Sequence, residues 1–249
     1  MATFVLVPGF WLGAWAWEEV AAELREEGHE ALPLTLTGLA ERAGELTPEL
    51  GLDVHIADVV AAAEGAGPGP VVLVAHSGAN MAVTGAADRV PDRVSRVVYV
   101  DSGPMPSGKA GIDFRSPDDR AELEKTVAGE GGGWTIPVPP FDADADPVNL
   151  AGLDEDRLAE IRRRGTPQPF ATVTQPLERP EPLPDTPRTL VACTIPLAAV
   201  RQMASGGNPV FAMMTGPGWT HRELPTGHWP MFSKPRELAA LLAKSAAQE

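Results

Sequence analysis

The chain has 249 residues, of which 43% are hydrophobic, and a formal net charge of −14. That length allows one large core, and no apolar run approaches the ~20 residues that a membrane-spanning helix needs. The negative charge argues against nucleic acid and anionic membranes as partners.

Strand and helix patterns alternate through the first hundred residues. The spacing of apolar residues predicts strands over 3–8, 30–36, 70–76 and 94–100, and helices over 14–27, 52–64 and 79–88. This alternation is typical of an α/β fold with a mostly parallel twisted sheet and helices on both faces.

The alternation stops between residues 103 and 187. This segment holds two helical stretches, near 118–128 and 154–164, among glycines and repeated prolines. Strands over 189–194 and 219–224 follow it, and a last helix begins near Pro235. We therefore predict a core made of 1–102 and 188–249, with residues 103–187 inserted as a cap over the strand ends.

The strand over 70–76 stops abruptly at Ser77. Small residues, Ala75 and Ala79, stand two positions before and after this serine. The pattern is that of a nucleophile elbow, Gly-x-Ser-x-Gly, with a methyl group in place of each glycine hydrogen. An ordinary turn after a strand produces the same pattern, so the match alone leaves both interpretations open.

Two further motifs stand where an acyl-transfer hydrolase needs them. Pro8-Gly9-Phe10 ends the first strand, and the loop there supplies one oxyanion-hole amide, the other coming from the residue after the nucleophile. We therefore expect the backbone N–H groups of Phe10 and Gly78 to form the oxyanion hole. His228 precedes the last helix, where the order Ser…acid…His places the general base.

Four segments together resemble a known family. They are VLVPGFWLGAW (5–15), HSG (76–78), TPQPFATVTQPL (166–177) and GHWPMFSKP (227–235). They resemble the α/β-hydrolase fold, in the branch that holds plant methylesterases, plant cyanohydrin lyases and their bacterial relatives. The resemblance implies that Ser77 is the nucleophile and His228 the base.

The chain departs from this family at the acid. The resemblance places an aspartate just after the strand over 189–194, but Ile195 follows there, and no acidic residue occurs between Asp185 and Glu223. Asp101 directly follows the strand over 94–100, and some hydrolases of this fold take their acid from that position. We predict Asp101 as the triad acid; a turn-forming aspartate and a working Ser–His dyad stay open.

A second departure concerns the reaction. Cyanohydrin lyases of this branch have a lysine directly after the catalytic histidine, and here that position is Trp229. An indole cannot stabilise cyanide in the same way, so we predict a serine carboxylesterase that cleaves a small, largely apolar ester without a cofactor. A lyase, cyclase or isomerase on the same scaffold remains an alternative, as does a binding protein that has lost turnover.

Several aromatic residues are candidates for the wall of the substrate pocket: Phe10, Trp11, Trp134, Phe170 and Trp229. His55 lies in an expected helix near Asp53 and Asp58, which we interpret as charges on a surface helix, so no metal site is predicted. A small-molecule substrate is the expected partner, and a homodimer is left open. The single cysteine, Cys193, and the lack of a basic leader lead us to expect a cytoplasmic protein.

Overall fold

A six-stranded sheet forms the centre of the computed structural model, which describes residues 1–247. Its order is β2 (Glu30–Pro33), β1 (Thr3–Val7), β3 (Val71–His76), β4 (Val94–Val100), β7 (Arg188–Ala192) and β8 (Trp219–Glu223). All neighbouring pairs in this sheet are parallel, as the alternating pattern predicted. The strand predicted over 94–100 is confirmed to the residue, and the others differ by a few residues at their ends.

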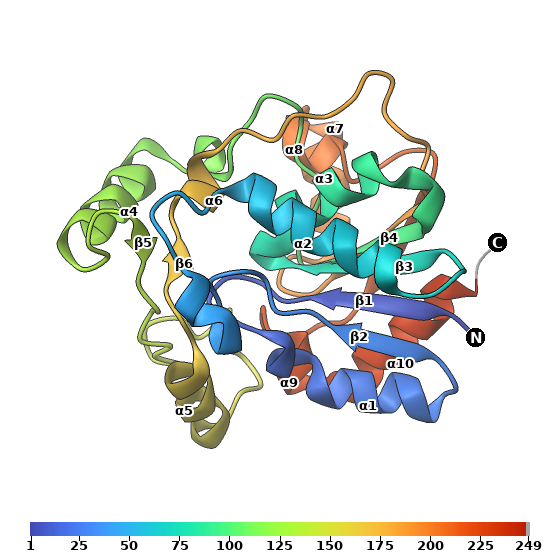
Figure 1. Cartoon of the computed structure of the whole chain (residues 1–249), viewed down its shortest axis with the longest axis horizontal. Coiled ribbons are helices and arrows are strands. Elements are labelled where there is room, and N and C mark those ends of the chain that lie inside the picture. Colours follow the sequence, from blue (N-terminus) through green and yellow to red (C-terminus); the bar gives the residue numbers. More distant parts are fainter. Residues whose placement is uncertain (248–249) are drawn as a thin grey trace.

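Helices cover both faces of the sheet (Figure 1). One face carries α1 (Glu18–Glu26), α9 (Pro230–Ser233) and α10 (Pro235–Ala246), and the other carries α2 (Leu52–Gly65) and α3 (Asn80–Arg89). Along β1, Phe4 and Leu6 pack into the first layer, while Val5 and Val7 pack into the second. Because side chains alternate along a strand, a continuous apolar run requires cover on both sides.

Residues 103–187 leave the sheet after β4 and return to it at β7. They form α4 (Pro117–Gly129), β5 (Thr135–Ile136), α5 (Glu155–Arg164), β6 (Gln168–Pro169) and α6 (Ala171–Thr174). In Figure 1, α4, α5, β5 and β6 gather at the left, at the opposite side from the two chain ends. The predicted helices near 118–128 and 154–164 are confirmed. The antiparallel pair β5–β6 was not predicted, because strands this short carry no periodicity.

Two helices between β7 and β8 were also missed by the sequence analysis. They are α7 (Leu197–Ser205) and α8 (Pro209–Ala212). Their apolar side chains join Leu190 and Ala192 of β7 in a small separate cluster, which includes Val200 and Met214. A short apolar stretch between glycines and a proline gives too weak a helical period to predict these elements.

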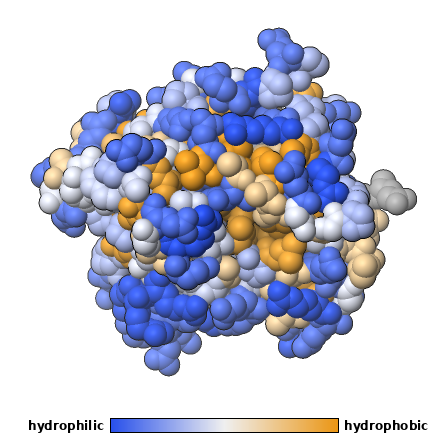
Figure 2. Space-filling view, viewed as in Figure 1, coloured by the Kyte–Doolittle hydropathy of each residue, from blue (hydrophilic) through white to orange (hydrophobic). Residues whose placement is uncertain are grey.

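The face in Figure 2 has hydrophilic residues around its rim and hydrophobic residues gathered across its centre. Within residues 1–247, no helix combines the length and the apolar character that crossing a bilayer requires. The large buried apolar side chains of β1, β3 and β4 pack into the layers on the two sides of the sheet.

Candidate active site

Ser77 lies at the sharp turn that joins β3 to α3. Its φ is 48°, in the left-handed region that residues other than glycine rarely adopt. Ala75 and Ala79 are both buried against this turn, so their methyl groups fit where the usual pattern has glycine. A strained residue at a strand end is the geometry of a nucleophile elbow.

Strand register brings Asp101 to the same edge of the sheet. His76, the last residue of β3, pairs with Val100, the last residue of β4, so Ser77 and Asp101 follow neighbouring strand ends. Asp101 also has a left-handed backbone, with a φ of 47°. Its N–H donates to the carbonyl of Val191 in β7, at 2.9 Å.

The side chains of Ser77, His228 and Asp101 form a continuous chain of hydrogen bonds. Ser77 Oγ lies 2.7 Å from His228 Nε2, and His228 Nδ1 lies 2.5 Å from Asp101 Oδ2. A carboxylate only accepts, so Nδ1 carries the ring proton and Nε2 accepts from the serine hydroxyl. This arrangement lets the imidazole take the serine proton as the oxygen attacks a carbonyl.

The carboxylate of Asp101 receives further hydrogen bonds from the end of β7. Oδ1 accepts from the N–H groups of Cys193 and Thr194, at 3.1 and 3.0 Å, and Oδ2 accepts from Thr194 Oγ1 at 2.8 Å. Burial alone would raise the pKa of Asp101, but the hydrogen bonds from His228 and Thr194 outweigh it and lower that pKa below its usual value. Asp101 is therefore held as a carboxylate facing His228.

Thr194 is a residue of this site that the sequence analysis missed. It stands just after β7 and directly before Ile195, the position at which the family resemblance had placed the acid. A signal was present, because Thr194 directly precedes the position at which the expected carboxylate is missing. Its hydrogen bonds to Asp101 became visible only once the two strand ends lay side by side.

His76, next to Ser77, is fully buried and joins the Ser77 turn to the loop that carries His228. Its Nε2 lies 2.7 Å from the carbonyl oxygen of His228, and because a carbonyl only accepts, Nε2 is the protonated nitrogen. Its Nδ1 is buried and has no hydrogen-bond partner among residues 1–247. Burial lowers the pKa of His76 to about 3, so the ring stays neutral near pH 7.

The loop after β1 packs directly on the elbow. A Cβ on Gly78 would lie 2.3 Å from the Phe10 ring, and one on Gly9 would lie 2.8 Å from His76 Nδ1. Glycine is therefore required at both positions by close approach. Across residues 1–247, the N–H of Phe10 donates to no other group. Gly78 lies in the first turn of a 3₁₀ helix, where amides have no partner within the helix.

A pocket of about 260 Å³ opens over Ser77. Its apolar wall consists of Phe10, Met81, Met105, Phe114 and Val173, and Asn80, Ser102 and Arg115 add polar groups. Among the predicted wall residues, all of which lie in the described part of the chain, Phe10 alone lines this pocket. The rest of the apolar wall consists of two methionines, Phe114 and Val173, for which the sequence offered no signal.

The other predicted wall residues lie elsewhere, which corrects that part of the sequence analysis. Trp229 is buried behind the site, with its ring centroid 5.2 Å from those of His76 and His228. Trp11 lines a separate groove with prolines 137, 139 and 140. Phe170 packs against the cluster around Ile112 and Val173, and its N–H donates to the carbonyl of Trp134.

The environment of His55 also differs from the expected surface helix. The side chain is buried, and its Nε2 lies 2.9 Å from the carbonyl oxygen of Thr37. Asp53 forms an ion pair with Arg89 on the surface, and Asp58 accepts hydrogen bonds from Thr37 and Arg42. In the described range 1–247, no group of three or more His, Cys, Asp or Glu residues is arranged to hold a metal ion.

A family model described as "Alpha/beta hydrolase family" matches residues 4–241. The chain belongs to the alpha/beta hydrolase family. This match confirms the fold that the sequence motifs indicated, and the six-stranded parallel sheet with its elbow after β3 is the family's architecture as it appears here.

Two curated members of this hydrolase family are similar over nearly their whole length. The carbendazim hydrolyzing esterase of Nocardioides sp. (strain SG-4G) is 31% identical over 266 residues, covering 98% of this chain and 99% of the relative. Methyl jasmonate esterase 1 of Vitis vinifera is 28% identical, covering 96% and 94%. The expected branch of plant methylesterases and bacterial relatives is thereby confirmed.

Solved structures of the family show the same fold. An extracellular alpha/beta-hydrolase from a Paenibacillus species superposes with a TM-score of 0.78 at 19% identity, over 100% of both chains. The methylesterase MES16 from Arabidopsis gives a TM-score of 0.74 at 19% identity, over 99% of both chains. With the esterases among its sequence relatives, the chain is a hydrolase of the carboxylesterase type.

Proposed function

We propose that this hydrolase cleaves small, largely apolar esters through an acyl-enzyme formed on Ser77. The observation that carries the proposal is the unbroken line of hydrogen bonds from Ser77 through His228 to Asp101. It supplies a nucleophile, a base with an accepting nitrogen, and a carboxylate that fixes the ring orientation.

The reaction would proceed in two halves. Ser77 Oγ attacks the ester carbonyl while His228 Nε2 takes the hydroxyl proton, and the resulting oxyanion accepts hydrogen bonds from the amides of Phe10 and Gly78. The imidazolium then gives its proton to the departing alcohol oxygen, leaving an ester on Ser77. Water attacks that ester with His228 again as base, which releases the acid and restores the serine.

The pocket over Ser77 supports a small and mainly apolar substrate. Met81 from α3 forms one part of the wall, and Met105, Phe114 and Val173 come from the segment 103–187. We propose that this segment acts as a cap, which excludes water and shapes the pocket while the sheet edge supplies the chemistry. We also keep the cytoplasm as the proposed setting, since Cys193 is buried and free.

A fluorophosphonate probe tests the nucleophile. We expect the parent protein to be labelled and Ser77→Ala to remain unlabelled, with thermal unfolding showing that both are folded. Labelling of both proteins, or of neither, would contradict the assignment.

Ester hydrolysis tests the reaction. A series of p-nitrophenyl and methyl esters should be cleaved with a burst of alcohol release, and methyl jasmonate and carbendazim belong in the series because relatives are named for them. Labelling of Ser77 without hydrolysis of any ester would favour a lyase, cyclase or isomerase, or a ligand-binding protein.

A further inference from the structure

The turn that carries the Phe10 amide is held by residues from the segment 103–187. Trp11 follows Phe10, and its carbonyl accepts from the N–H of Thr166 at 2.9 Å and from the Thr166 hydroxyl at 3.4 Å. Its indole Nε1 donates to the carbonyl of Ile136 at 3.3 Å, and its backbone N–H donates to Gln168 Oε1 at 3.4 Å. Every hydrogen-bonding group of Trp11 is thus bonded to that segment.

The backbone of Trp11 is strained. Its φ is 68°, which for a bulky residue costs on the order of 1–3 kcal/mol and persists only where the surroundings impose it. The hydrogen bonds to Thr166, Gln168 and Ile136 supply that constraint. Edge-to-face contacts with Phe10 and Phe141, at centroid distances of 5.8 and 6.0 Å, fix the indole on its other sides.

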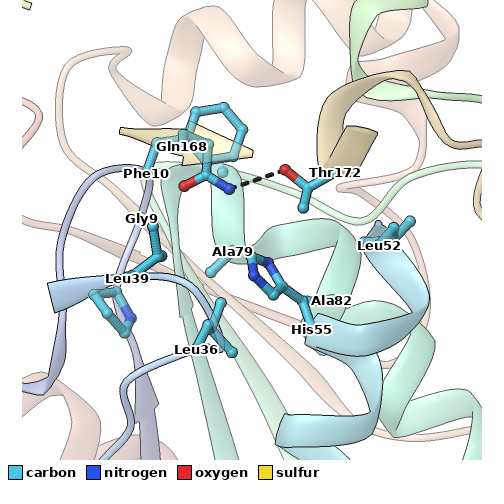
Figure 3. Close-up of a pocket in the computed structure, with 12 residues that line it drawn as sticks. Gly9, Phe10, Leu36, Leu39, Leu52, His55, Ala79, Ala82, Gln168 and Thr172 are labelled. Carbon is cyan, nitrogen blue, oxygen red and sulfur yellow. Dashed lines mark hydrogen bonds between the residues drawn. The ribbon is translucent and has the colours of Figure 1, made fainter. Parts of the chain in front are cut away.

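Gln168 is itself fixed in place. It is 2% exposed, and its Nε2 donates to Thr172 Oγ1 at 2.9 Å, while that hydroxyl donates to the carbonyl of Pro169 at 2.7 Å. Figure 3 shows Gln168 and Thr172 on one side of a small cavity lined by Phe10. Its volume of about 10 Å³ admits roughly one water molecule and no substrate. The turn at Phe10 is therefore packed against fixed side chains of the segment 103–187, with no room for a substrate between them.

We propose that Trp11 is a positioning residue, through which the segment 103–187 sets the oxyanion-hole amide of Phe10. This inference rests on the proposed function, because it assumes that the Phe10 amide binds an oxyanion. It assigns the inserted segment a part in catalysis besides shaping the pocket: β6 and its flanking residues complete the site that the sheet edge begins.

A purely structural role for Trp11 makes a different prediction. Packing lost on substitution would lower stability and affect ground state and transition state alike. A displaced oxyanion-hole donor instead weakens only the binding of a developing negative charge. The two roles are therefore separated by comparing kcat with KM, and by comparing a transition-state analogue with a ground-state ligand.

Trp11→Phe is the test variant, and Trp134→Phe is its matched control. Phenylalanine at 11 keeps an aromatic ring against Phe10 and Phe141 but loses the donor to Ile136. Trp134 lies in the segment 103–187, and its backbone carbonyl accepts a hydrogen bond from the N–H of Phe170, which phenylalanine at 134 preserves. We expect kcat for a p-nitrophenyl ester to fall about tenfold in Trp11→Phe with KM changed less than twofold, and to stay unchanged in Trp134→Phe.

A trifluoromethyl ketone supplies the transition-state readout. Ser77 Oγ adds to its carbonyl, the hydroxyl proton passes to His228, and the new oxyanion occupies the hole. Its inhibition constant should weaken in Trp11→Phe by the same factor as kcat/KM, whereas competitive inhibition by the product alcohol should not change.

Gln168→Leu provides a second variant of similar size should Trp11→Phe fail to fold. It removes the acceptor for the Trp11 amide and should show the same pattern with a smaller loss. Equal losses in Trp11→Phe and Trp134→Phe, or unchanged affinity for the ketone, would overturn the inference. A parent protein that hydrolyses no ester would overturn the proposed function instead, before any variant is compared.

Discussion

The ends of β4 and β7 lie side by side. The residue that follows β4 carries a carboxylate, and the residues that follow β7 donate hydrogen bonds to it. Asp101 directly follows β4 and faces His228, while Cys193 and Thr194 directly follow β7 and donate hydrogen bonds to Asp101. The family resemblance had placed the acid after β7. From this comparison we predict that neighbouring strand ends of a parallel sheet are alternative sites for the acid, because they meet at one edge within reach of the same imidazole.

The largest expected effect comes from removing the charge at the end of β4. Asp101→Asn should lower kcat for a p-nitrophenyl ester by about 10³–10⁴, with KM little changed, because the amide no longer holds the required tautomer or stabilises imidazolium. Asp92→Asn, an exposed acid just before β4, is the control and should match the parent. A loss below about threefold in Asp101→Asn would mean that a Ser–His dyad works alone.

A carboxylate placed after β7 instead of after β4 tests whether the two strand ends are interchangeable. Thr194 Oγ1 and His228 Nδ1 bond the same oxygen of Asp101, at 2.8 and 2.5 Å, so a carboxylate on residue 194 lies close to the imidazole. We expect the double variant Asp101→Asn/Thr194→Asp to regain about tenfold or more in kcat over Asp101→Asn alone. Asp101→Asn/Thr194→Asn controls for shape, and equal activity of the two double variants would show that the strand ends are not interchangeable.

The donors of β7 should matter less than the acid itself. Thr194→Val keeps the shape but removes a hydrogen bond to a charged group, which is worth about 1.5–3 kcal/mol, so kcat should fall roughly tenfold or more. Loss of that donor also raises the pKa of Asp101. Thr194→Ser keeps the hydroxyl and should approach the parent in kcat. The measurement is kcat from pH 4 to 8, and identical pH profiles of Thr194→Val and Thr194→Ser would contradict a role for the hydroxyl.

Stability as a function of pH separates the end of β3 from the ends of β4 and β7. Burial lowers the pKa of His76 to about 3, so between its ordinary value of 6.5 and 3 the unfolded chain binds a proton that the folded chain does not. The free energy of unfolding therefore falls as pH falls through that window, by about 1.4 kcal/mol per pH unit. The contribution of Asp101, whose pKa is lowered, is present above 3.8 and is lost only as pH falls below that value.

Urea unfolding at pH 7, 6, 5 and 4 measures this difference. His76→Gln keeps an N–H donor without a group that titrates, so its slope should be flatter than the parent's by about 1.4 kcal/mol per pH unit. His55, whose pKa burial also lowers, leaves part of the slope in both proteins. Parallel slopes for parent and variant would show that His76 is already neutral in the unfolded chain or protonated in the folded one.

The smallest effect should follow from Cys193→Ala. Cys193 bonds Asp101 through its backbone N–H alone, and its side chain is buried in the core. The variant should lose about 1 kcal/mol of stability in urea unfolding, while kcat changes less than twofold. A large loss of kcat would mean that the thiol, and not the amide, supports the acid.

Local patterns were enough to predict much of this molecule. The strand over 94–100 is rich in valine and ends at a polar turn, and the observed β4 has those bounds. Ser77 stood out because a buried strand stopped between small residues, and His228 because of its place before the last helix. The place of Asp101 after the preceding strand, where some hydrolases of this fold have their acid, then suggested that residue. The structure brings these three side chains into contact; their catalytic roles remain predictions.

The remaining parts depend on how distant segments pack together. The pocket wall includes Met81, Met105 and Val173. These residues have no sequence signature, because an apolar side chain in the core would give the same pattern as one in a pocket wall. Trp11 and Gln168 are 157 positions apart in sequence, and no pattern in either segment predicts their hydrogen bond.

The sequence by itself determined the six strands of the main sheet and their order along the chain, the family, and the three residues whose chemistry fits ester cleavage. These follow from periodicity and from residue type at short range, which each segment carries within itself. Tertiary structure alone decided which groups hold Asp101, which side chains line the pocket and what supports the Phe10 turn. Such contacts join segments that lie far apart along the chain, so no local sequence pattern predicts them and they exist only in the folded molecule.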